Sequence, residues 1–141
     1  MAGRNQYLDH LAAVPLFAAC SHKELQRIAR ASDETELPAG RVLTRQGETG
    51  RECFVIVEGQ VTVERNGKRI ASLGPGACIG DLALLDKGPR TATVTAVSPL
   101  KVLVLGPREF AGVLEEVPGL ARKLLSALAT KVRELDKKAY G

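Results

Sequence analysis

The residue types that could do chemistry are concentrated in one glycine-rich segment, residues 74–94. Within it, the stretch from Asp81 to Leu85 predicts a single short helical turn, and the first N–H groups of such a turn have no partner inside it. N–H groups arranged in this way bind anions, and Gly80 lets the backbone come close to a ligand. Arg90 follows a Gly-Pro turn that could return its guanidinium to the same place. Because arginine is always charged and its planar fork matches phosphate oxygens, the segment predicts a phosphate site.

Two neighbouring residues extend this prediction to a phosphate carried on a sugar. Thr91 places a hydroxyl beside Arg90. Asp81 would repel a bare phosphate, so we expect its carboxylate to face a hydroxyl-bearing part of the ligand, such as a ribose. Each feature also has a simpler interpretation, since an Asp at a helix start is most often an N-cap and a glycine-rich turn is often only a turn. Spacing alone leaves both interpretations open.

The region that must position this segment has the pattern of short β-strands, from about residue 34 to residue 105. Asn66-Gly67 lies between two alternating runs, which is a strong signal of a β-hairpin. Glycines separate the other runs, and no long helix interrupts them. We therefore predict a mainly β fold, an eight-stranded β-roll or jelly-roll barrel. Its clearest strands are the runs 41–44, 54–57, 61–63, 69–71, 91–97 and 100–105.

Residues 5–31, on the N-terminal side of the strands, have a helical pattern. Ser21 followed by Glu24 is the signature of a capping box, which predicts a helix beginning after Ser21. Pro15 falls inside the pattern and predicts a turn between two helical pieces, because proline breaks the helix interior.

Two helices are predicted after the strands. The first begins at Pro107, which suits a first helical position, and ends at the Pro118-Gly119 break. The second covers residues 120–138 and carries a short heptad seam. This seam consists of Ala121, Leu125, Leu128, Val132 and Leu135. We expect one domain over residues 1–141, made of N-terminal helices (1–33), a β-roll (34–105) and C-terminal helices (107–138).

Length and composition limit the function classes. The chain has 141 residues, of which 45% are hydrophobic and 26% charged, as in an ordinary globular domain. No apolar run approaches the roughly 18 residues that a spanning helix needs, and no signal peptide is visible. Three cysteines at wide spacing fit neither a disulfide framework nor a metal pair, so we interpret them as reduced thiols of a cytoplasmic protein.

The net charge of +4 lies entirely in residues 120–141, which hold six basic and two acidic residues. This pattern fits a solvated helix face with cations near the C-terminal end of the helix dipole. It also fits a helix that faces an anion or a protein partner. DNA binding is a weaker alternative, because tryptophan is absent, aromatic residues total 4% and no motif for reading bases is found.

The segment that carries Asp81 and Arg90 resembles a motif of a known protein family. Two stretches on either side of a four-residue spacer resemble the phosphate-binding cassette (residues 80–92) of the cyclic nucleotide-binding domain family. That family includes the sensor domain of catabolite activator protein, the regulatory subunits of cyclic-AMP-dependent kinase and the gating domains of nucleotide-gated channels. The stretches are Gly80-Asp81-Leu82-Ala83-Leu84-Leu85 and Arg90-Thr91-Ala92-Thr93-Val94. In addition, 57–61 resembles the glycine turn of the family and 14–17 resembles its N-terminal entry element.

The resemblance implies a role for each position of the cassette. Arg90 would pair with the cyclic phosphate, and the Thr91 hydroxyl would assist it. Gly80 and Asp81 would contact the ribose. At position 81 the family usually has Glu, and Asp is one methylene shorter, so its hydrogen bond to the 2′-hydroxyl would lengthen, tilt or run through water. Thr91 does not distinguish cyclic AMP from cyclic GMP. Phosphate oxygens would also be held by backbone N–H groups of Leu82, Ala83, Thr91 and Ala92.

The resemblance also gives the last helix two candidate roles. It would act as a lid over the base through Leu124, Leu128 and Val132. It would alternatively pair with a second chain along the heptad seam. Simple packing of the helix against the roll is the third interpretation.

We therefore expect a cyclic mononucleotide (cyclic AMP or cyclic GMP) sensor that couples ligand binding to movement of the C-terminal helix. Its expected partners are the nucleotide, an unidentified protein effector and a candidate homodimer copy; no nucleic acid, membrane, cofactor or metal is expected. The chain ends at Gly141, which leaves no room for a helix-turn-helix, so a stand-alone sensor and an excised domain of a larger regulator or channel both remain open. An interaction scaffold with a degenerate pocket is another alternative. A metal enzyme on a cupin-like roll is disfavoured, because the two histidines, His10 and His22, lie in the helical N-terminal part.

Overall fold

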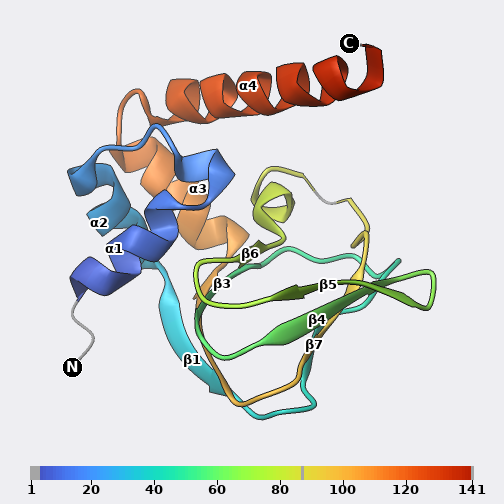
Figure 1. Ribbon diagram of the computed structural model, residues 1–141. Helices are drawn as coiled ribbons and strands as arrows, with labels where there is room; N and C mark the ends of the chain where they lie inside the picture. Colours follow the sequence, from blue (N-terminus) through green and yellow to red (C-terminus); the bar gives the residue numbers. More distant parts are fainter. Residues whose placement is uncertain (1–3, 87, 141) are drawn as a thin grey trace.

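Within residues 4–86 and 88–140, which the computed structural model describes, eight strands form two antiparallel four-stranded sheets (Figure 1). The strand order is β1-β8-β3-β6 in one sheet and β2-β7-β4-β5 in the other. The strands are β1 (Asp33–Leu37), β2 (Val42–Thr44), β3 (Cys53–Glu58), β4 (Val61–Arg65), β5 (Lys68–Leu73), β6 (Cys78–Ile79), β7 (Thr93–Ala96) and β8 (Leu100–Leu105). The mainly β roll that the sequence predicts is confirmed, and the described strands do not close into a continuous barrel.

The hairpin between β4 and β5 forms where Asn66-Gly67 predicts it. Asn66 has φ 55° and Gly67 has φ 78°, the two positive values that a type I′ turn requires. The sequence did not single out β1 and β6. β1 is a strand of mostly charged residues that pairs on one side only, and β6 has only two residues, so neither has the apolar run that identifies a strand.

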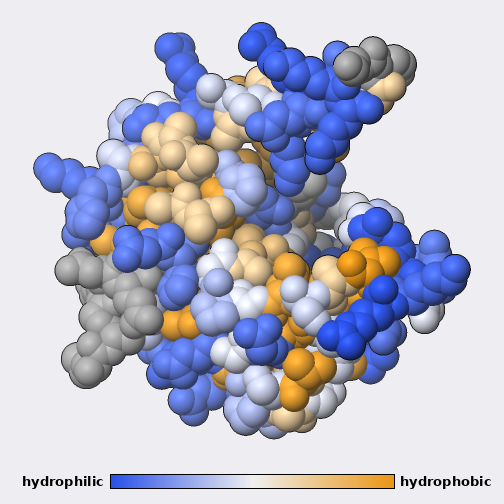
Figure 2. All heavy atoms as spheres, in the orientation of Figure 1, coloured by the Kyte–Doolittle hydropathy of each residue, from blue (hydrophilic) through white to orange (hydrophobic). Residues whose placement is uncertain are grey.

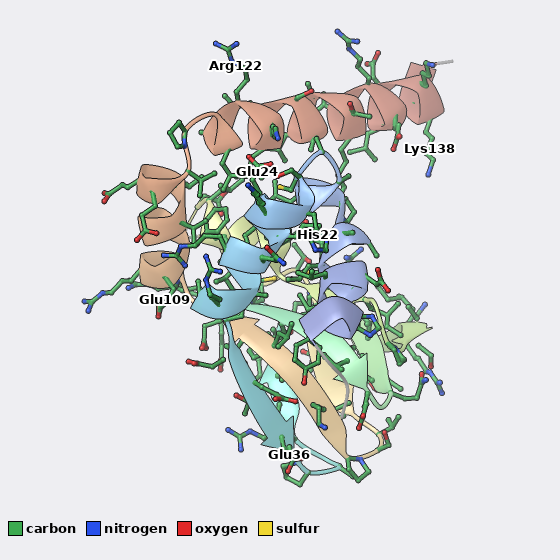
Figure 3. All side chains as sticks on the ribbon, turned by 90° about the vertical axis from the view of Figure 1, so that its left-hand side faces the viewer. His22, Glu24, Glu36, Glu109, Arg122 and Lys138 are labelled. Carbon is green, nitrogen blue, oxygen red and sulfur yellow. The ribbon has the colours of Figure 1, made fainter. Side chains whose placement is uncertain are left out.

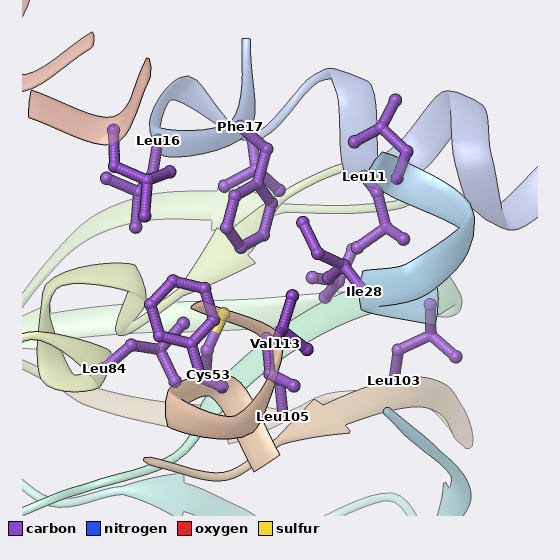
Figure 4. Close-up of a cluster of buried hydrophobic side chains, with 14 of the residues drawn as sticks. Leu11, Leu16, Phe17, Ile28, Cys53, Leu84, Leu103, Leu105 and Val113 are labelled. Carbon is purple, nitrogen blue, oxygen red and sulfur yellow. The ribbon is translucent and has the colours of Figure 1, made fainter. Parts of the chain in front are cut away.

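Side chains between the two sheets form one apolar core, and the helices cover the outer face of the β1-β8-β3-β6 sheet with a second. β3 contributes to both cores, because Phe54 and Ile56 point between the sheets while Cys53 and Val55 point toward the helices. Figure 4 shows Cys53 in the second core beside Leu84. A strand with both faces buried explains the continuous apolar run at 53–57.

The N-terminal segment contains α1 (Arg4–Ala12), the 3-10 turn η1 (Pro15–Phe17) and α2 (His22–Ala31). The predicted capping box is present: Ser21 N–H donates to Oε1 of Glu24 at 2.7 Å, and Glu24 N–H donates to Oγ of Ser21 at 3.2 Å. The predicted break at Pro15 is also present, as the proline begins η1. Phe17 packs against Phe110, with ring centroids 6.1 Å apart, and so attaches this segment to the helix that follows the roll.

After β8 the chain forms α3 (Pro107–Glu116) and the long α4 (Leu120–Tyr140). The first turns of α4 are attached to the other helices by the buried Leu120 and Leu124. Nζ of Lys123 also donates to Oε1 of Glu24 on α2 at 2.6 Å. From residue 131 onward the described side chains of α4 are exposed, and this part extends beyond the other helices (Figure 1). None of the described helices combines the length and apolar character needed to cross a membrane.

Candidate functional site

The cassette begins where the chain leaves β6 and turns at Gly80, whose φ of 80° favours glycine. The predicted helical turn follows as the 3-10 turn η2 (Asp81–Leu84), in which Ala83 N–H donates to the Gly80 carbonyl at 3.0 Å. A cavity of about 300 Å³ lies beside this turn. Its lining consists of Gly80, Asp81, Ala83, Asp86, Gly88, Pro89, Arg90 and Thr91. Of the predicted phosphate and ribose residues, the structure therefore brings Gly80, Asp81, Ala83, Arg90 and Thr91 together around one cavity. Leu82 and Ala92 do not line it: Leu82 belongs to η2, and Ala92 follows Thr91 in the chain.

The backbone of Arg90 is held by the loop between β2 and β3. Gly47 N–H donates to the Arg90 carbonyl, and Arg90 N–H donates to the Glu48 carbonyl, both at 2.8 Å. This reciprocal pair resembles one rung of an antiparallel ladder, and it continues as an isolated bridge between Thr49 and Pro89. The loop thus fixes the backbone position from which the Arg90 side chain extends.

The guanidinium of Arg90 lies against the backbone of Gly50, Glu52 and Gly80, which we call the arginine seat. Nη2 donates to the Glu52 carbonyl at 2.7 Å. A Cβ on Gly50 would lie 2.6 Å from Cδ of Arg90 and closer still to Nε and Cζ. A Cβ on Gly80 would overlap Nη1 and lie 3.1 Å from the Glu52 carbonyl oxygen. Both glycines are therefore required by the close approach of the guanidinium.

The electrostatics of Arg90 favour an anion beside it. Nη1 is buried, and among the residues that the structure describes it has no hydrogen-bond partner and the side chain forms no ion pair. Burial lowers the pKa of Arg90, because a charge removed from water without a partner is destabilised. A ligand oxygen at Nη1 would provide the missing acceptor and the missing negative charge.

The two residues after Arg90 are attached to the roll through their carbonyl groups. The carbonyl of Thr91 accepts a hydrogen bond from Nε of Arg65 at 3.0 Å, and the carbonyl of Ala92 accepts one from Oγ1 of Thr44 at 3.1 Å. Thr91 is exposed beside the cavity, whereas the side chain of Ala92 is buried in the core between the sheets. These two hydrogen bonds thus attach the end of the cassette to β2 and β4, two strands of the same sheet.

The family model described as the cyclic nucleotide-binding domain matches residues 34–117, more than half of the chain. The chain belongs to the cyclic nucleotide-binding domain family. Among curated proteins, the domain is 39% identical over 111 residues to a cyclic nucleotide-gated potassium channel of Mesorhizobium japonicum, covering 79% of this chain and 31% of the channel. It is 28% identical to the cyclic AMP receptor protein of Thermus thermophilus, covering 86% of this chain and 59% of that protein. The chain thus spans less than two thirds of these relatives.

Solved structures agree with this assignment of the domain. The N-terminal domain of a transcriptional regulator from Streptomyces coelicolor superposes with a TM-score of 0.84 at 35% identity, covering 92% of this chain and 94% of that one. The regulatory domain of Toxoplasma gondii PKA, solved with cAMP, superposes with a TM-score of 0.70 at 29% identity, covering 80% and 45% of the two chains. By their descriptions, these two structures belong to a transcriptional regulator and to the regulatory domain of a kinase.

The residues predicted as the lid of the domain do not line the cavity beside Arg90. Leu124 is buried in the helical core, Leu128 is half-buried against the same core, and Val132 is 63% exposed. The attachment of the first turns of α4 to the N-terminal helices accounts for this placement. In Figure 2 a recess separates the projecting part of α4 from the roll. Contact of these residues with a base stays a prediction, and it requires a different position of α4.

Sequence reasoning missed the arginine seat on the loop between β2 and β3. Gly50 and Glu52 belong to a stretch that carried no predicted role, although Arg90 depends on both. The signal that could have found it is the pair Gly47 and Gly50 between two predicted strands, since closely spaced glycines often mark a backbone that another group approaches. Within the described ranges, no group of three or more metal-ligating side chains occurs.

Proposed function

We propose that this domain is a cytoplasmic sensor of a cyclic mononucleotide, cyclic AMP or cyclic GMP. In this proposal the cyclic phosphate binds Nη1 of Arg90 and the N–H groups of Leu82 and Ala83, the latter in place of its hydrogen bond to the Gly80 carbonyl, and the Thr91 hydroxyl donates a further hydrogen bond. The observation that carries the proposal is the Arg90 side chain, which lines a cavity beside η2 and whose buried Nη1 has no hydrogen-bond partner among the described residues. The PKA regulatory domain of Toxoplasma gondii, which was solved with cAMP, supports the ligand class.

The charges around the cavity support a cyclic phosphodiester over an open phosphate. Asp81 and Asp86 line the cavity together with Arg90. A cyclic phosphodiester carries a single negative charge, whereas a terminal phosphate carries nearly two at neutral pH and is repelled more strongly by two carboxylates. We assign Asp81 to the ribose 2′-hydroxyl, which can donate to its carboxylate. 5′-AMP is therefore a discriminating control ligand.

We further propose that ligand binding moves α4 toward the recess, and that a protein effector responds to this movement. The contacts of the helix support a two-position element, because only its first turns are buried and the rest is exposed. The ion pair between Lys123 and Glu24 holds these first turns on α2. A ligand can shift α4 only as far as it binds one position better than the other, so Leu124, Leu128 and Val132 would supply that difference by contacting the base.

The exposed seam of α4 supports a homodimer as the partner arrangement. Leu125, Val132 and Leu135 are 66%, 63% and 59% exposed, although large apolar side chains in a line are usually covered. We expect the wild-type chain to run as a dimer in size-exclusion chromatography with light scattering, and Val132→Glu to run as a monomer. A wild-type chain that stays monomeric up to high micromolar concentration would refute the dimer.

The decisive experiment compares Arg90→Ala with the wild type by isothermal titration calorimetry against cyclic AMP, cyclic GMP and 5′-AMP. Loss of a charge-assisted contact costs about 1.5–3 kcal/mol, so we expect Kd to rise about 10- to 150-fold with the fold unchanged. Arg122→Ala is the matched control, because Arg122 points away from the body of the molecule (Figure 3). Equal binding by Arg90→Ala would refute the site, and no binding of either cyclic nucleotide by the wild type would favour the scaffold with a degenerate pocket.

A further inference from the structure

Two of the three cysteines lie against each other next to the arginine seat. Sγ of Cys53 and Sγ of Cys78 are 3.0 Å apart. Cys78 pairs in register with Val55 on the neighbouring strand, so Cys53, two residues before Val55, is its diagonal neighbour on the same face of the sheet. Both thiols are free, and both face the core beneath the helices. A disulfide has an S–S length of about 2.05 Å, so the two sulfurs are about 1 Å too far apart for the bond.

The strand that carries Cys78 can supply this movement. β6 has two residues and lies at the edge of its sheet, so β3 is its only neighbour among the described strands. It is also followed directly by Gly80, where the chain turns into the cassette. A short edge strand shifts by about 1 Å at a lower cost than a central strand, because few hydrogen bonds oppose it.

Formation of the disulfide would reach the guanidinium of Arg90 by two routes, one on each strand. Cys53 directly follows Glu52, whose carbonyl accepts the hydrogen bond from Nη2 of Arg90. Cys78 lies two residues before Gly80, whose Cα lies against Nη1. Two of the three residues of the arginine seat therefore lie within two positions of a thiol of the pair.

We propose that Cys53 and Cys78 are an oxidisable dithiol, and that its conversion to an intramolecular disulfide displaces the arginine seat and weakens binding of the cyclic nucleotide. Formation of the disulfide is argued from the geometry of the pair, whereas its effect on nucleotide binding rests on the proposed function. The oxidant is a hydroperoxide such as hydrogen peroxide, which is small enough to reach Cys78, the partly exposed member of the pair.

The oxidation proceeds in two steps. Cys78 loses its proton and attacks the peroxide, the O–O bond breaks, and a sulfenic acid and water result. The Cys53 thiol then attacks the sulfenic sulfur, the S–S bond forms, and the S–O bond breaks as water leaves with the thiol proton. The net reaction converts two thiols and one hydrogen peroxide into one disulfide and two waters.

The surroundings of the pair make this oxidation slow at neutral pH. The hydrogen bond with Cys53, burial and the nearby carboxylate of Asp81 raise the pKa of the Cys78 thiol, and the Asp81 backbone acts in the opposite direction. Arg90 lies close enough to Cys53 for the two groups to interact electrostatically. Because oxidation is proposed to weaken nucleotide binding, linkage requires that bound nucleotide shift the dithiol–disulfide equilibrium toward the dithiol by the same factor.

The test treats the full chain with millimolar hydrogen peroxide, blocks the remaining thiols and measures the intact mass and a tryptic map. We expect a loss of two hydrogens, a cross-link between peptides 52–65 and 70–87, and a blocked, unlinked Cys20. Calorimetry of the oxidised chain should show a Kd for the cyclic nucleotide at least about tenfold higher, and reduction should restore it. Cys20→Ala, a matched control, should respond like the wild type, whereas Cys78→Ala should keep its affinity after peroxide.

Each other result overturns a defined part of the proposal. Over-oxidised single thiols, or a cross-link that includes Cys20, would refute the dithiol. A 53–78 disulfide with unchanged affinity would refute the coupling to Arg90. If the reduced chain binds neither cyclic nucleotide, the proposed function and the coupling fail together, while the mass measurement still decides whether the disulfide forms.

Discussion

Gly50→Ala should weaken nucleotide binding without changing either a charged residue or the backbone conformation. Gly50 does not have a positive φ, so alanine fits its backbone. The new Cβ would lie 2.6 Å from Cδ of Arg90 and nearer still to Nε and Cζ, whereas Cβ atoms essentially never come within 3.0 Å of another group. The guanidinium must therefore move by about 1 Å or more, which breaks its 2.7 Å hydrogen bond to the Glu52 carbonyl.

The expected changes in stability and in Kd depend on which atoms Gly50→Ala displaces. The displaced atoms are the far end of a flexible side chain at the edge of the roll, so the free energy of unfolding should change by less than about 1 kcal/mol. The phosphate contact of Arg90 should lose about 1.5–3 kcal/mol, because charge-assisted hydrogen bonds depend steeply on geometry. Kd for the cyclic nucleotide should rise about 10- to 150-fold, close to the effect of Arg90→Ala.

Isothermal titration calorimetry gives Kd, and thermal unfolding without ligand gives the stability. Gly112→Ala is the matched control, since a Cβ there meets nothing within 4 Å; inside α3 it should raise stability by about 1 kcal/mol and leave Kd unchanged. Gly80→Ala should lower both affinity and stability, because its φ is positive and the Cβ also meets backbone. A Gly50→Ala variant that is fully folded and binds with the wild-type Kd would show that the arginine seat does not matter for binding.

Two further measurements test the attachment of the N-terminal helices. The pKa of the Glu24 carboxyl is lowered, chiefly by the hydrogen bond from Lys123 and then by the capping box. Its contribution to stability is therefore fully present above the unfolded pKa of 4.5 and disappears as the pH falls through the lower pKa of the folded state. Glu24→Gln should lower the free energy of unfolding by about 1 kcal/mol at pH 7, a modest figure because Lys123 is 38% exposed. On acidification, the free energy of unfolding of Glu24→Gln should fall less than that of the wild type. Parallel pH profiles of thermal unfolding for the two proteins would contradict this. The hydrogen bond from Tyr7 to Glu34 raises the pKa of the Tyr7 phenol to about 12. Ultraviolet titration should therefore show a tyrosine that ionises near this value. This transition should be absent in Tyr7→Phe and should shift toward about 10 in Glu34→Gln. If the Glu34→Gln midpoint stays near 12, the carboxylate is not the cause.

Features encoded by neighbouring residues were predictable from the sequence. The turn at Asn66-Gly67 and the capping box of Ser21 and Glu24 formed as predicted, because turn and cap chemistry depend on a few adjacent residues. The cassette was found in the same way, since its glycine, helical turn and arginine lie within one short segment. The two-residue β6 was missed, because a strand of that length has no periodicity to detect.

Contacts between distant parts of the chain required the tertiary structure. Glu52 and Arg90 are 38 residues apart, and no local pattern predicts that the carbonyl of one accepts a hydrogen bond from the other. The pairing of Cys53 with Cys78 likewise follows from strand register, whereas their wide spacing in the chain suggested separate thiols.

The amino-acid sequence by itself determined a β-roll and predicted a short phosphate-binding segment, because alternation of side chains, glycine turns and helix caps act over a few residues. The tertiary structure decided what surrounds the guanidinium of Arg90 and where α4 lies, because packing brings together backbone atoms and buried faces that are far apart in the chain. We expect the affinity of the proposed site to depend on that second set of contacts, since a cation binds an anion more tightly when its geometry is held before the ligand arrives.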